Sequence, residues 1–454
     1  MEFTFSGKHL ALEEQAFKAP TQGNSSDRAS PLNPLHYDET FGRDGKLLIT
    51  MGGRRTFWVS SLVQLRTGSK YLASYYEGFT LDNPDPDINN SGVVCFDARG
   101  NIDTSFGTRG DGTVDIRFGA TDYSFPQQII ELNNGKLLVI GVHRRFLDTQ
   151  FLHVMMTRLE PDGSADTSFG NEGVLNITSL ANRPLRFVGT VVLADGKIIM
   201  AATIAEEGPL GSLLIKLTPD GRLDESFAGQ GILELQRSAA KGTQLYGLKL
   251  VEAGTRLLTY GYYPVPAGYT VGFMTRLDTD GNFDPNFGQN SFVDLEPAEE
   301  HQVMDVSITS DESHLLVTGL HFNRELRIEE SLLARCLPNG KPDERFNNGK
   351  PVYLRLHPTS TYDFWNDART LIDKAGKIVV FGNGGTPTDS WSVAGRFHST
   401  GEPDTSFTEG SSVGSPPGAS FFPRGSYVVE GSNPRTILCA GAAEGSGAVL
   451  AIKV

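Results

Sequence analysis

The chain has 454 residues, of which 39% are hydrophobic and 21% charged, a composition that excludes large-scale disorder. It carries 40 Lys and Arg against 54 Asp and Glu, and therefore a formal net charge of −14. Because so acidic a surface repels phosphate backbones, we expect no nucleic-acid partner. No apolar run has the length of a membrane span and no secretory signal is visible. We therefore expect a cytoplasmic protein, or one exported without a visible signal peptide.

Residues 1–34 contain no repeat, and we interpret them as an N-terminal extension and linker. Ser6 is a candidate cap for a short helix from about Lys8 to Lys18, and a turn-rich stretch follows it. The sequence leaves open whether this extension docks on the rest of the protein.

From residue 35 to residue 454 one phrase recurs: Asp, two residues, Phe, and usually Gly. Its phenylalanines are Phe41, Phe106, Phe169, Phe227, Phe287, Phe346 and Phe407. The copies lie roughly sixty residues apart, and seven copies at so steady a period indicate a repeat architecture.

The third full unit shows the pattern of each repeat. Apolar runs cover 187–194, 197–204, 212–218 and 231–235, and the Asp-Gly pairs at 195–196 and 220–221 mark turns. Short apolar or alternating runs between such turns are typical of antiparallel strands. We call these strands A to D, and a corresponding A–B hairpin is visible in every unit.

Seven four-stranded units predict an all-β fold, a seven-bladed β-propeller closed around an axis. The last unit ends at strand C with residues 448–454, whereas the first repeat begins with a D-like strand at 45–50. The N-terminal strand is therefore expected to complete the last blade and to remove an open sheet edge.

The recurring G-x-x-D-x-x-F-G phrase resembles the delta-60 repeat of bacterial β-propellers, and the hairpins resemble those of NHL and SMP-30-type propellers. The resemblance covers about residues 35–454 and implies the propeller fold, but it implies no functional residue. Leu35 replaces the first glycine in copy one, and the glycine after Phe is replaced by Ala228, Asn347 and Thr408.

The motif aspartates form a repeated set: Asp38, Asp103, Asp166, Asp224, Asp284, Asp343 and Asp404. A ring of seven carboxylates suggests a metal or catalytic site at first. Aspartate also accepts backbone N–H bonds in turns, the phenylalanine can fill the gap between blades, and glycine supplies positive φ. Because these residues occur in every blade, we expect them to have a structural role that all blades share. We therefore interpret the motif as scaffold.

Function is expected where the blades differ, in the long B–C and D–A loops that share one face. These loops contain the aromatic candidates for ligand binding: Trp58, Tyr123, Tyr262, Tyr263, Tyr269, Tyr362, Trp365 and Trp391. Aromatic rings beside Asp, Asn and Arg suit a glycan or a protein surface. The same rings could instead hold their own loops in place.

Two weaker candidates concern metals. Asp85, Asp87 and Asn89 resemble the first half of a calcium loop, but Phe96 stands at its twelfth position, so calcium is left open and no other cofactor is expected. His143, His301, His321 and His357 come from different units and could converge near the axis. Glu299, Glu300 and Asp305 lie near His301, which makes it the candidate metal ligand.

We favour a non-catalytic recognition module that binds a glycan or protein partner. The alternatives are a metal-dependent hydrolase of the lactonase or glycosidase type with an axial site, and a purely structural scaffold. No catalytic motif with fixed spacing is present in the sequence.

Overall fold

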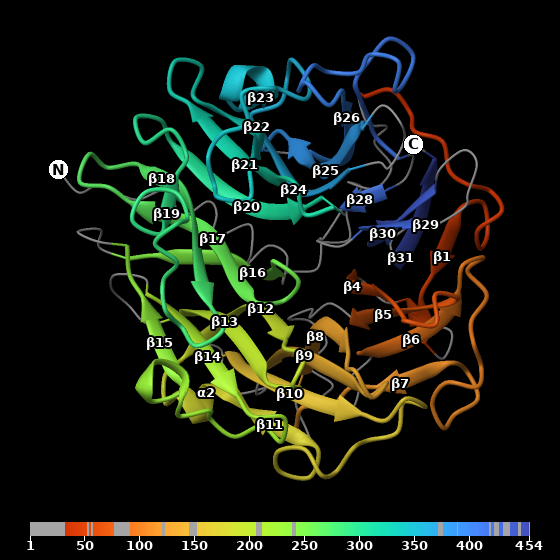
Figure 1. The fold of residues 1–454 in the computed structure, drawn as a ribbon. Coiled ribbons are helices and arrows are strands. Elements are labelled where there is room, and N and C mark those ends of the chain that lie inside the picture. The colour runs from red at the N-terminus through yellow and green to blue at the C-terminus, as the bar shows by residue number, and fades with distance from the viewer. Residues whose placement is uncertain are drawn as a thin grey trace.

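The chain forms seven antiparallel sheets arranged like blades around a common centre (Figure 1). The computed structural model describes residues 32–51, 54–55, 58–76, 91–119, 123–144, 152–205, 211–237, 242–309, 311–370, 376–387, 389–416, 419–421, 426–429, 436–443 and 446–453. The predicted helix near Lys8–Lys18 lies outside these residues. The seven-bladed propeller of four-stranded blades is confirmed.

The strands of the first six blades follow one another along the chain. Blade 1 contains β4 (Trp58–Gln64), β5 (Lys70–Tyr76), β6 (Gly92–Asp97) and β7 (Thr113–Asp115). Blade 2 contains β8 (Tyr123–Glu131), β9 (Leu137–Arg144), β10 (Leu152–Leu159) and β11 (Val174–Asn176). Blade 3 contains β12 (Leu185–Val192), β13 (Ile198–Ile204), β14 (Ser212–Leu217) and β15 (Ile232–Leu235). Blade 4 contains β16 (Gln244–Val251), β17 (Arg256–Pro264), β18 (Thr270–Asp278) and β19 (Phe292–Asp294). Blade 5 contains β20 (His301–Ile308), β21 (Leu315–Asn323), β22 (Ile328–Cys336) and β23 (Val352–Leu354). Blade 6 contains β24 (Tyr362–Thr370), β25 (Ile378–Gly385), β26 (Ser390–Phe397) and β27 (Val413–Gly414).

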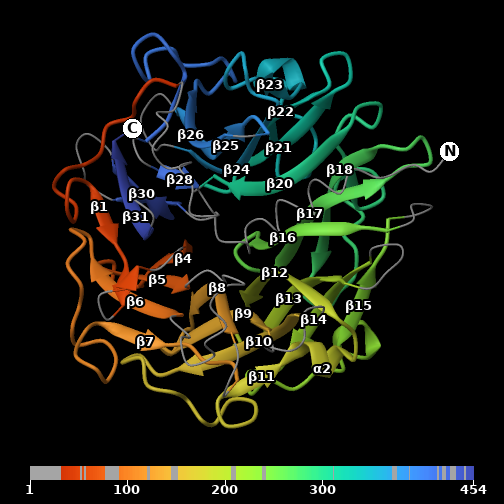
Figure 2. The same cartoon turned by 180° about the vertical axis from the view of Figure 1, so that it is seen from behind.

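Blade 7 joins the two ends of the chain. It contains β28 (Ala419–Phe421), β29 (Ser426–Val429), β30 (Thr436–Ala443), β31 (Ser446–Lys453) and β1 (Lys46–Leu48). The N-terminal β1 lies beside β31 (Figure 2). The two strands pair antiparallel, with Leu47 opposite Val449. Closure of the last blade by an N-terminal strand is therefore as predicted.

A few short elements complete the described fold. They are the hairpin of β2 (Thr50–Met51) and β3 (Arg54–Arg55), the helix α2 (Ile177–Ala181), and the 3₁₀ turns η1 (Phe227–Gly229) and η2 (Asn347–Gly349). The Asn176 side chain caps α2 by accepting a hydrogen bond from the Ser179 N–H. None of the described residues forms a helix long and apolar enough to cross a membrane.

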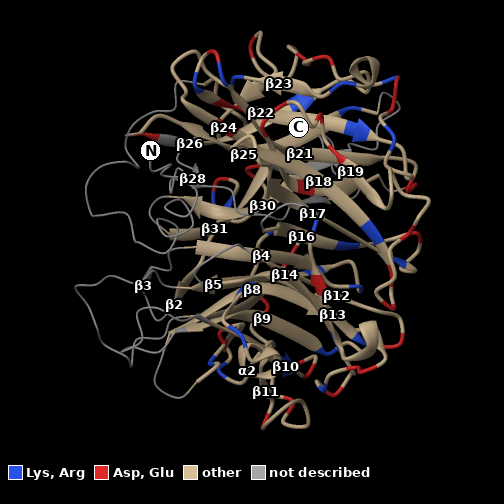
Figure 3. Ribbon diagram, turned by 90° about the vertical axis from the view of Figure 1, so that its left-hand side faces the viewer, with Lys and Arg blue, Asp and Glu red and all other residues tan. Residues whose placement is uncertain are grey.

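The hydrophobic core lies between neighbouring blades. One cluster packs Leu138 and Ile140 of blade 2 against Ile198 and Met200 of blade 3, and similar clusters join other blades. The charged residues lie mostly at strand ends and turns of the backbone, whereas the strands through the middle of the molecule carry few of them (Figure 3).

The motif phenylalanine fills the gap between one blade and the next, as the sequence predicted. At six turn glycines with φ of +79° to +93°, a Cβ would lie 3.0–3.2 Å from the phenylalanine ring of the preceding blade. The six are Gly100, Gly163, Gly221, Gly281, Gly340 and Gly401. A side chain there would meet both a strained backbone and an occupied space.

The motif aspartate accepts hydrogen bonds from its own turn and from nearby cationic side chains. Asp166 accepts hydrogen bonds from the Ser168 N–H and hydroxyl, from Lys136 Nζ at 2.9 Å, and from Arg158 Nε at 2.5 Å. Residue Arg158 precedes Asp166 by eight positions, and its guanidinium also donates to the Pro219 carbonyl of the next blade. Asp166 therefore links strands B and C of its blade to its own turn, which supports the scaffold interpretation.

The cation eight residues before the aspartate recurs in five blades: Arg158, Lys216, Arg276, Arg335 and Arg396. The Cζ of each arginine, or the Nζ of the lysine, lies 4.8–5.7 Å from the centre of the motif phenylalanine ring in the same blade. The fixed spacing was visible in the sequence and was missed there.

Candidate functional site on the loop face

The loop face is the end of the propeller where strand A begins and strand B ends. In six blades the first strand A residue pairs with a residue late in strand B, and this register position holds a different pair each time. The pairs are Trp58–Tyr76, Tyr123–Arg144, Leu185–Ile204, Gln244–Tyr262, His301–His321 and Tyr362–Gly385. These residues are not part of the repeated motif. We therefore expect a function that is specific to one blade to lie at this register position.

Blade 5 brings two histidines and a tyrosine together at this position. His301 is fully buried, and its Nε2 lies 2.7 Å from the Tyr353 hydroxyl. The Tyr353 hydroxyl donates to Glu296 Oε2 at 2.6 Å, so its oxygen accepts from the Nε2–H of His301. The His321 ring stacks on Tyr353 with centroids 4.1 Å apart.

Three glutamates surround these rings. His321 Nδ1 lies 3.3 Å from Glu330 Oε2, and His321 Nε2 lies 3.7 Å from Glu299 Oε2. We name His301, His321, Tyr353, Glu296, Glu299 and Glu330 the His–Tyr–Glu cluster. It lies at the boundary of blades 4 and 5, because Glu296 and Glu299 belong to the connection between β19 and β20.

Burial sets the protonation of the cluster. Burial, together with the neighbouring His321, lowers the pKa of His301 to about 3, so its imidazole is neutral. Burial and the bond to Glu296 raise the pKa of Tyr353, which keeps its phenol protonated as a donor. Burial also raises the pKa of Glu300, the residue before His301. His301 and Tyr353 thus present neutral hydrogen-bonding rings beside the glutamates of the cluster.

Tyr269 borders the cluster from blade 4. Its hydroxyl donates to the Pro297 carbonyl at 2.9 Å, and the Arg324 guanidinium lies 4.3 Å from its ring centre. Tyr269 and His301, two of the predicted site residues, are therefore brought to the same blade boundary. Tyr353 and Glu296 were missed, because neither stands in a recognisable motif and only the fold brings them to His301.

Blade 6 carries a second group of buried polar atoms. Asp363 is fully buried; its Oδ2 accepts from the Ser360 hydroxyl at 2.5 Å and from the Leu356 N–H at 2.9 Å. Asp363 Oδ1 and Trp391 Nε1 have no hydrogen-bond partner among the residues that the structure describes. Both lie beside Gly384, where a Cβ would be 2.3 Å from Asp363 Oδ1 and 3.3 Å from Trp391 Nε1. Burial raises the pKa of Asp363 to about 7.

The remaining predicted aromatics are spread over several blades. Trp365 is fully buried against Phe397, so its ring offers no surface to a ligand in this structure. Trp391 is 7% exposed and meets the His357 ring edge-on. Tyr262 donates to Gln244, and Tyr263 is buried against Phe273. Tyr123 is 9% exposed and stacks on Phe125, while Trp58 and Tyr362 are half-buried.

The candidate metal ligands do not form a site among the described residues. No group of three or more His, Cys, Asp or Glu side chains there is arranged to hold a metal ion. Asp85, Asp87 and Asn89 lie outside the described residues. The Nε2 of His301 is engaged by Tyr353, and His143 lies in blade 2, away from the blade 5 pair.

The comparison with protein families agrees with the propeller fold. Residues 193–227 match the model of a β-propeller family described as a domain of unknown function, DUF5122. No curated protein sequence matches the chain. Among solved structures, Drosophila Semaphorin 2a has a TM-score of 0.49 and 8% identity, over 92% of this chain and 76% of that one. The α-L-arabinofuranosidase Arb93A of Fusarium graminearum has a TM-score of 0.41 and 10% identity, over 81% of this chain and 97% of that one.

Proposed function

We propose that this β-propeller is a non-catalytic recognition module, and that its loop face binds a glycan or protein partner at the boundary of blades 4 and 5. The observation that carries the proposal is the His–Tyr–Glu cluster. It occupies a register position that differs in every blade compared, whereas the repeated aspartates are engaged by the scaffold. The resemblance to delta-60 repeats fits such a scaffold but supplies no ligand.

The chemistry of the boundary indicates what the partner must present. Glu299 is 49% exposed at its side chain, and Glu296 and Glu330 stand beside it around aromatic rings. Carboxylates accept hydrogen bonds and offer none when ionised. The partner should therefore present donors, which are sugar hydroxyls on a glycan or Lys and Arg side chains on a protein.

A binding screen tests the proposal and separates the two partner classes. The full chain would be applied to immobilised glycans and to basic peptides, and each hit would be measured by calorimetry. We expect Glu299→Gln or Tyr269→Ala to weaken binding by about tenfold, or ~1.4 kcal/mol. The matched control is Glu225→Gln, which removes an exposed carboxylate from the opposite face.

Three results would overturn the proposal. Binding that neither loop-face variant changes would place the ligand elsewhere on the propeller. Turnover of a bound glycoside or lactone by the purified protein would replace the recognition module with the hydrolase alternative. If no glycan or basic peptide binds, the purely structural scaffold becomes the better account.

A further inference from the structure

His321 lies between two carboxylates that come from different elements of the loop face. Its Nδ1 lies 3.3 Å from Oε2 of Glu330, on β22, and its Nε2 lies 3.7 Å from Oε2 of Glu299, in the connection between β19 and β20. The ring is stacked on Tyr353, with centroids 4.1 Å apart, and its centroid lies 5.2 Å from that of His301. These neighbours hold the ring in a plane in which each nitrogen faces a carboxylate.

A neutral imidazole can satisfy only one of these two carboxylates. It carries a single N–H, and its second nitrogen is an acceptor. The distances assign the N–H to Nδ1, which is bonded to Glu330, and leave Nε2 facing Glu299 beyond hydrogen-bonding distance. Glu299 is also the more exposed carboxylate, with 49% of its side chain open to solvent against 14% for Glu330. In this state the Glu299 oxygens can accept hydrogen bonds from a partner.

A protonated imidazole can satisfy both carboxylates at once. Each of its nitrogens is then a donor, and the attraction between opposite charges draws Glu299 toward Nε2 of His321. Protonation thus links the connection between β19 and β20 to β22, and it occupies carboxylate oxygens that otherwise face solvent. Sugar hydroxyls and cationic side chains need these same oxygens as acceptors. The partner and the protonated imidazole therefore compete for them.

The two rings that pack against His321 keep their charge over the pH range in which histidine ordinarily titrates. Burial, together with the neighbouring His321, lowers the pKa of His301 to about 3. Burial and the hydrogen bond to Glu296 raise the pKa of Tyr353. His301 therefore stays neutral, and Tyr353 stays protonated, between about pH 5 and pH 8.

Carboxyl groups complete the surroundings of His321. Burial raises the pKa of Glu300, the residue before His301. The charged or titratable side chains that Glu300 faces are Arg324, Glu329 and His321. Asp363 of blade 6 interacts with Glu330, and burial raises its pKa to about 7. Asp363 is therefore a second group that changes charge near neutral pH, and a test of His321 must separate the two.

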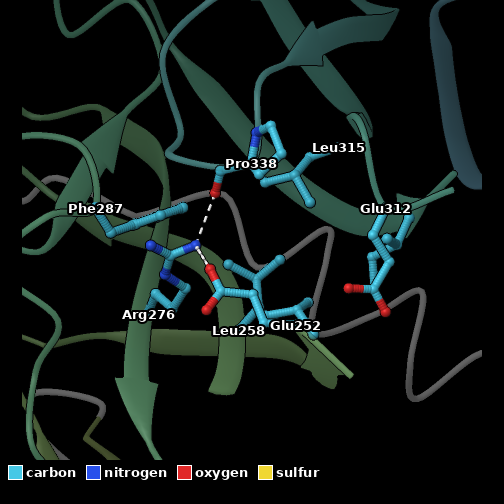
Figure 4. A pocket seen from close by; sticks show the side chains of 9 residues that line it. Glu252, Leu258, Arg276, Phe287, Glu312, Leu315 and Pro338 are labelled. Atoms are coloured by element: carbon cyan, nitrogen blue, oxygen red, sulfur yellow. Dashed lines mark hydrogen bonds and ion pairs between the residues drawn. The ribbon is translucent and has the colours of Figure 1, made fainter. Parts of the chain in front are cut away.

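On the opposite face of the propeller, a carboxylate of blade 4 is paired with a permanently charged side chain instead. Arg276 lines a pocket there and donates to Glu252 Oε1 and to the Pro338 carbonyl (Figure 4). A guanidinium keeps its proton throughout the range in which histidine titrates. Glu252 therefore provides a matched control for the two carboxylates that face His321.

We propose that His321 is a pH sensor of the loop face, which leaves the His–Tyr–Glu cluster open to its partner at neutral pH and closes it when the pH falls. In the open state His321 is bonded to Glu330 alone, and in the closed state it is bonded to Glu330 and Glu299. Histidine suits this role because it ordinarily changes charge between about pH 5 and pH 8. The inference rests on the proposed function, since it assigns the regulation of the same site.

A titration of the free protein tests the sensor itself. The histidine Cε1–H signals would be followed by NMR between about pH 5 and pH 8, and the His321 signal would be assigned from its loss in His321→Gln. We expect this signal to titrate. Its midpoint should fall by about 0.2–0.7 pH units in Glu299→Gln and in Glu330→Gln, as suits partly exposed ion pairs, and should not change in Glu252→Gln. A His321 signal that does not titrate in this range, or a midpoint that both glutamate variants at the cluster leave unchanged, would overturn the proposal.

Binding at two pH values tests the regulation. The probe is a capped tetralysine peptide, because its charge is constant over this pH range. We expect the original protein to bind it about three- to fivefold more weakly at about pH 5.5 than at about pH 7.5. Asp363→Asn should keep this difference, and His321→Gln should remove it.

The outcomes separate the sensor from the proposed function. Equal affinity of the original protein at both pH values, or an undiminished difference in His321→Gln, would overturn the proposal. If tetralysine binds at neither pH value, the result counts against a basic protein partner and thus against the proposed function. The titration of His321 in the free protein then decides independently whether the sensor exists.

Discussion

At the scale of single residues, the motif turn keeps its left-handed backbone conformation even where another residue replaces the glycine. Glycine follows the phenylalanine in most copies, but Ala228 stands there in blade 3 and still has φ of +48°. A left-handed conformation costs a non-glycine residue roughly 1–2 kcal/mol. The turn of blade 3 therefore contains local strain that glycine would remove.

We predict that Ala228→Gly stabilises the protein by about 0.5–1 kcal/mol, since part of the gain is offset by the greater freedom of glycine in the unfolded chain. Urea denaturation monitored by tryptophan fluorescence measures this. Ala165→Gly is the matched control, because that exposed alanine does not have positive φ, and it should be neutral or destabilising. A destabilised Ala228→Gly would mean that the alanine methyl makes a contact of its own.

Asp363 gives a pH prediction at the same scale. Burial raises its pKa in the folded protein to about 7, whereas the unfolded value is near 3.9. Between these values the folded state holds a proton that the unfolded chain has lost, so this group lowers the free energy of unfolding as the pH rises from about 4 to about 7. Below and above that window its contribution is constant.

Asp363→Asn cannot ionise, and its amide oxygen can still accept the bonds from Ser360 and Leu356. We predict that the free energy of unfolding of Asp363→Asn, relative to the original protein, rises by about 2–4 kcal/mol between pH 4.5 and pH 7.5. Denaturation at both pH values tests this, with the exposed Asp195→Asn as the control. A difference independent of pH would show that Asp363 is ionised in the folded state throughout.

At the scale of elements, strand order and hairpins were predictable because turn chemistry and apolar runs are local. The closing strand was predictable too, because the last unit ends at strand C. The candidate site was less predictable from the sequence. Tyr353 lies 52 positions from His301, and only the packing of strand D back across blade 5 brings them together. The burial of Trp365 likewise depends on the facing blade, which the sequence of its loop does not reveal.

The aspartate–cation group joins elements within a blade, so removing its charge should weaken several strands together. Asp166 is 4% exposed and faces both Lys136 and Arg158. We predict that Asp166→Asn lowers the free energy of unfolding by about 1–3 kcal/mol, because Arg158 loses its carboxylate partner, whereas Lys136 keeps its ion pair with Glu160. Asp44→Asn, at a side chain 85% exposed, should change it by less than about 0.5 kcal/mol. Equal effects of the two variants on the urea midpoint would contradict the assigned role.

At the scale of the whole molecule, three residue pairs between β1 and β31 close the ring. Leu47 and Ile49 are buried in a cluster that also contains Leu438 and Val449 of blade 7. If β1 detaches, β31 loses both this apolar cover and its hydrogen-bonding neighbour. An eight-residue, largely buried strand then becomes an open edge, which invites pairing with a second molecule.

Leu47→Pro should produce this state, since proline removes the N–H of the central paired residue and costs about 3 kcal/mol or more in regular structure. Leu47→Ala is the matched control: it loses the same apolar contacts but keeps the backbone hydrogen bond. We predict that Leu47→Pro, and not Leu47→Ala, forms dimers or larger species in size-exclusion chromatography with light scattering. If both variants remain monomeric with the same urea midpoint, the pairing of β1 with β31 does not hold the ring closed. The hydrogen bonds of residues 33–38 to residues 415 and 451–453, together with the contacts between blades, must then do so.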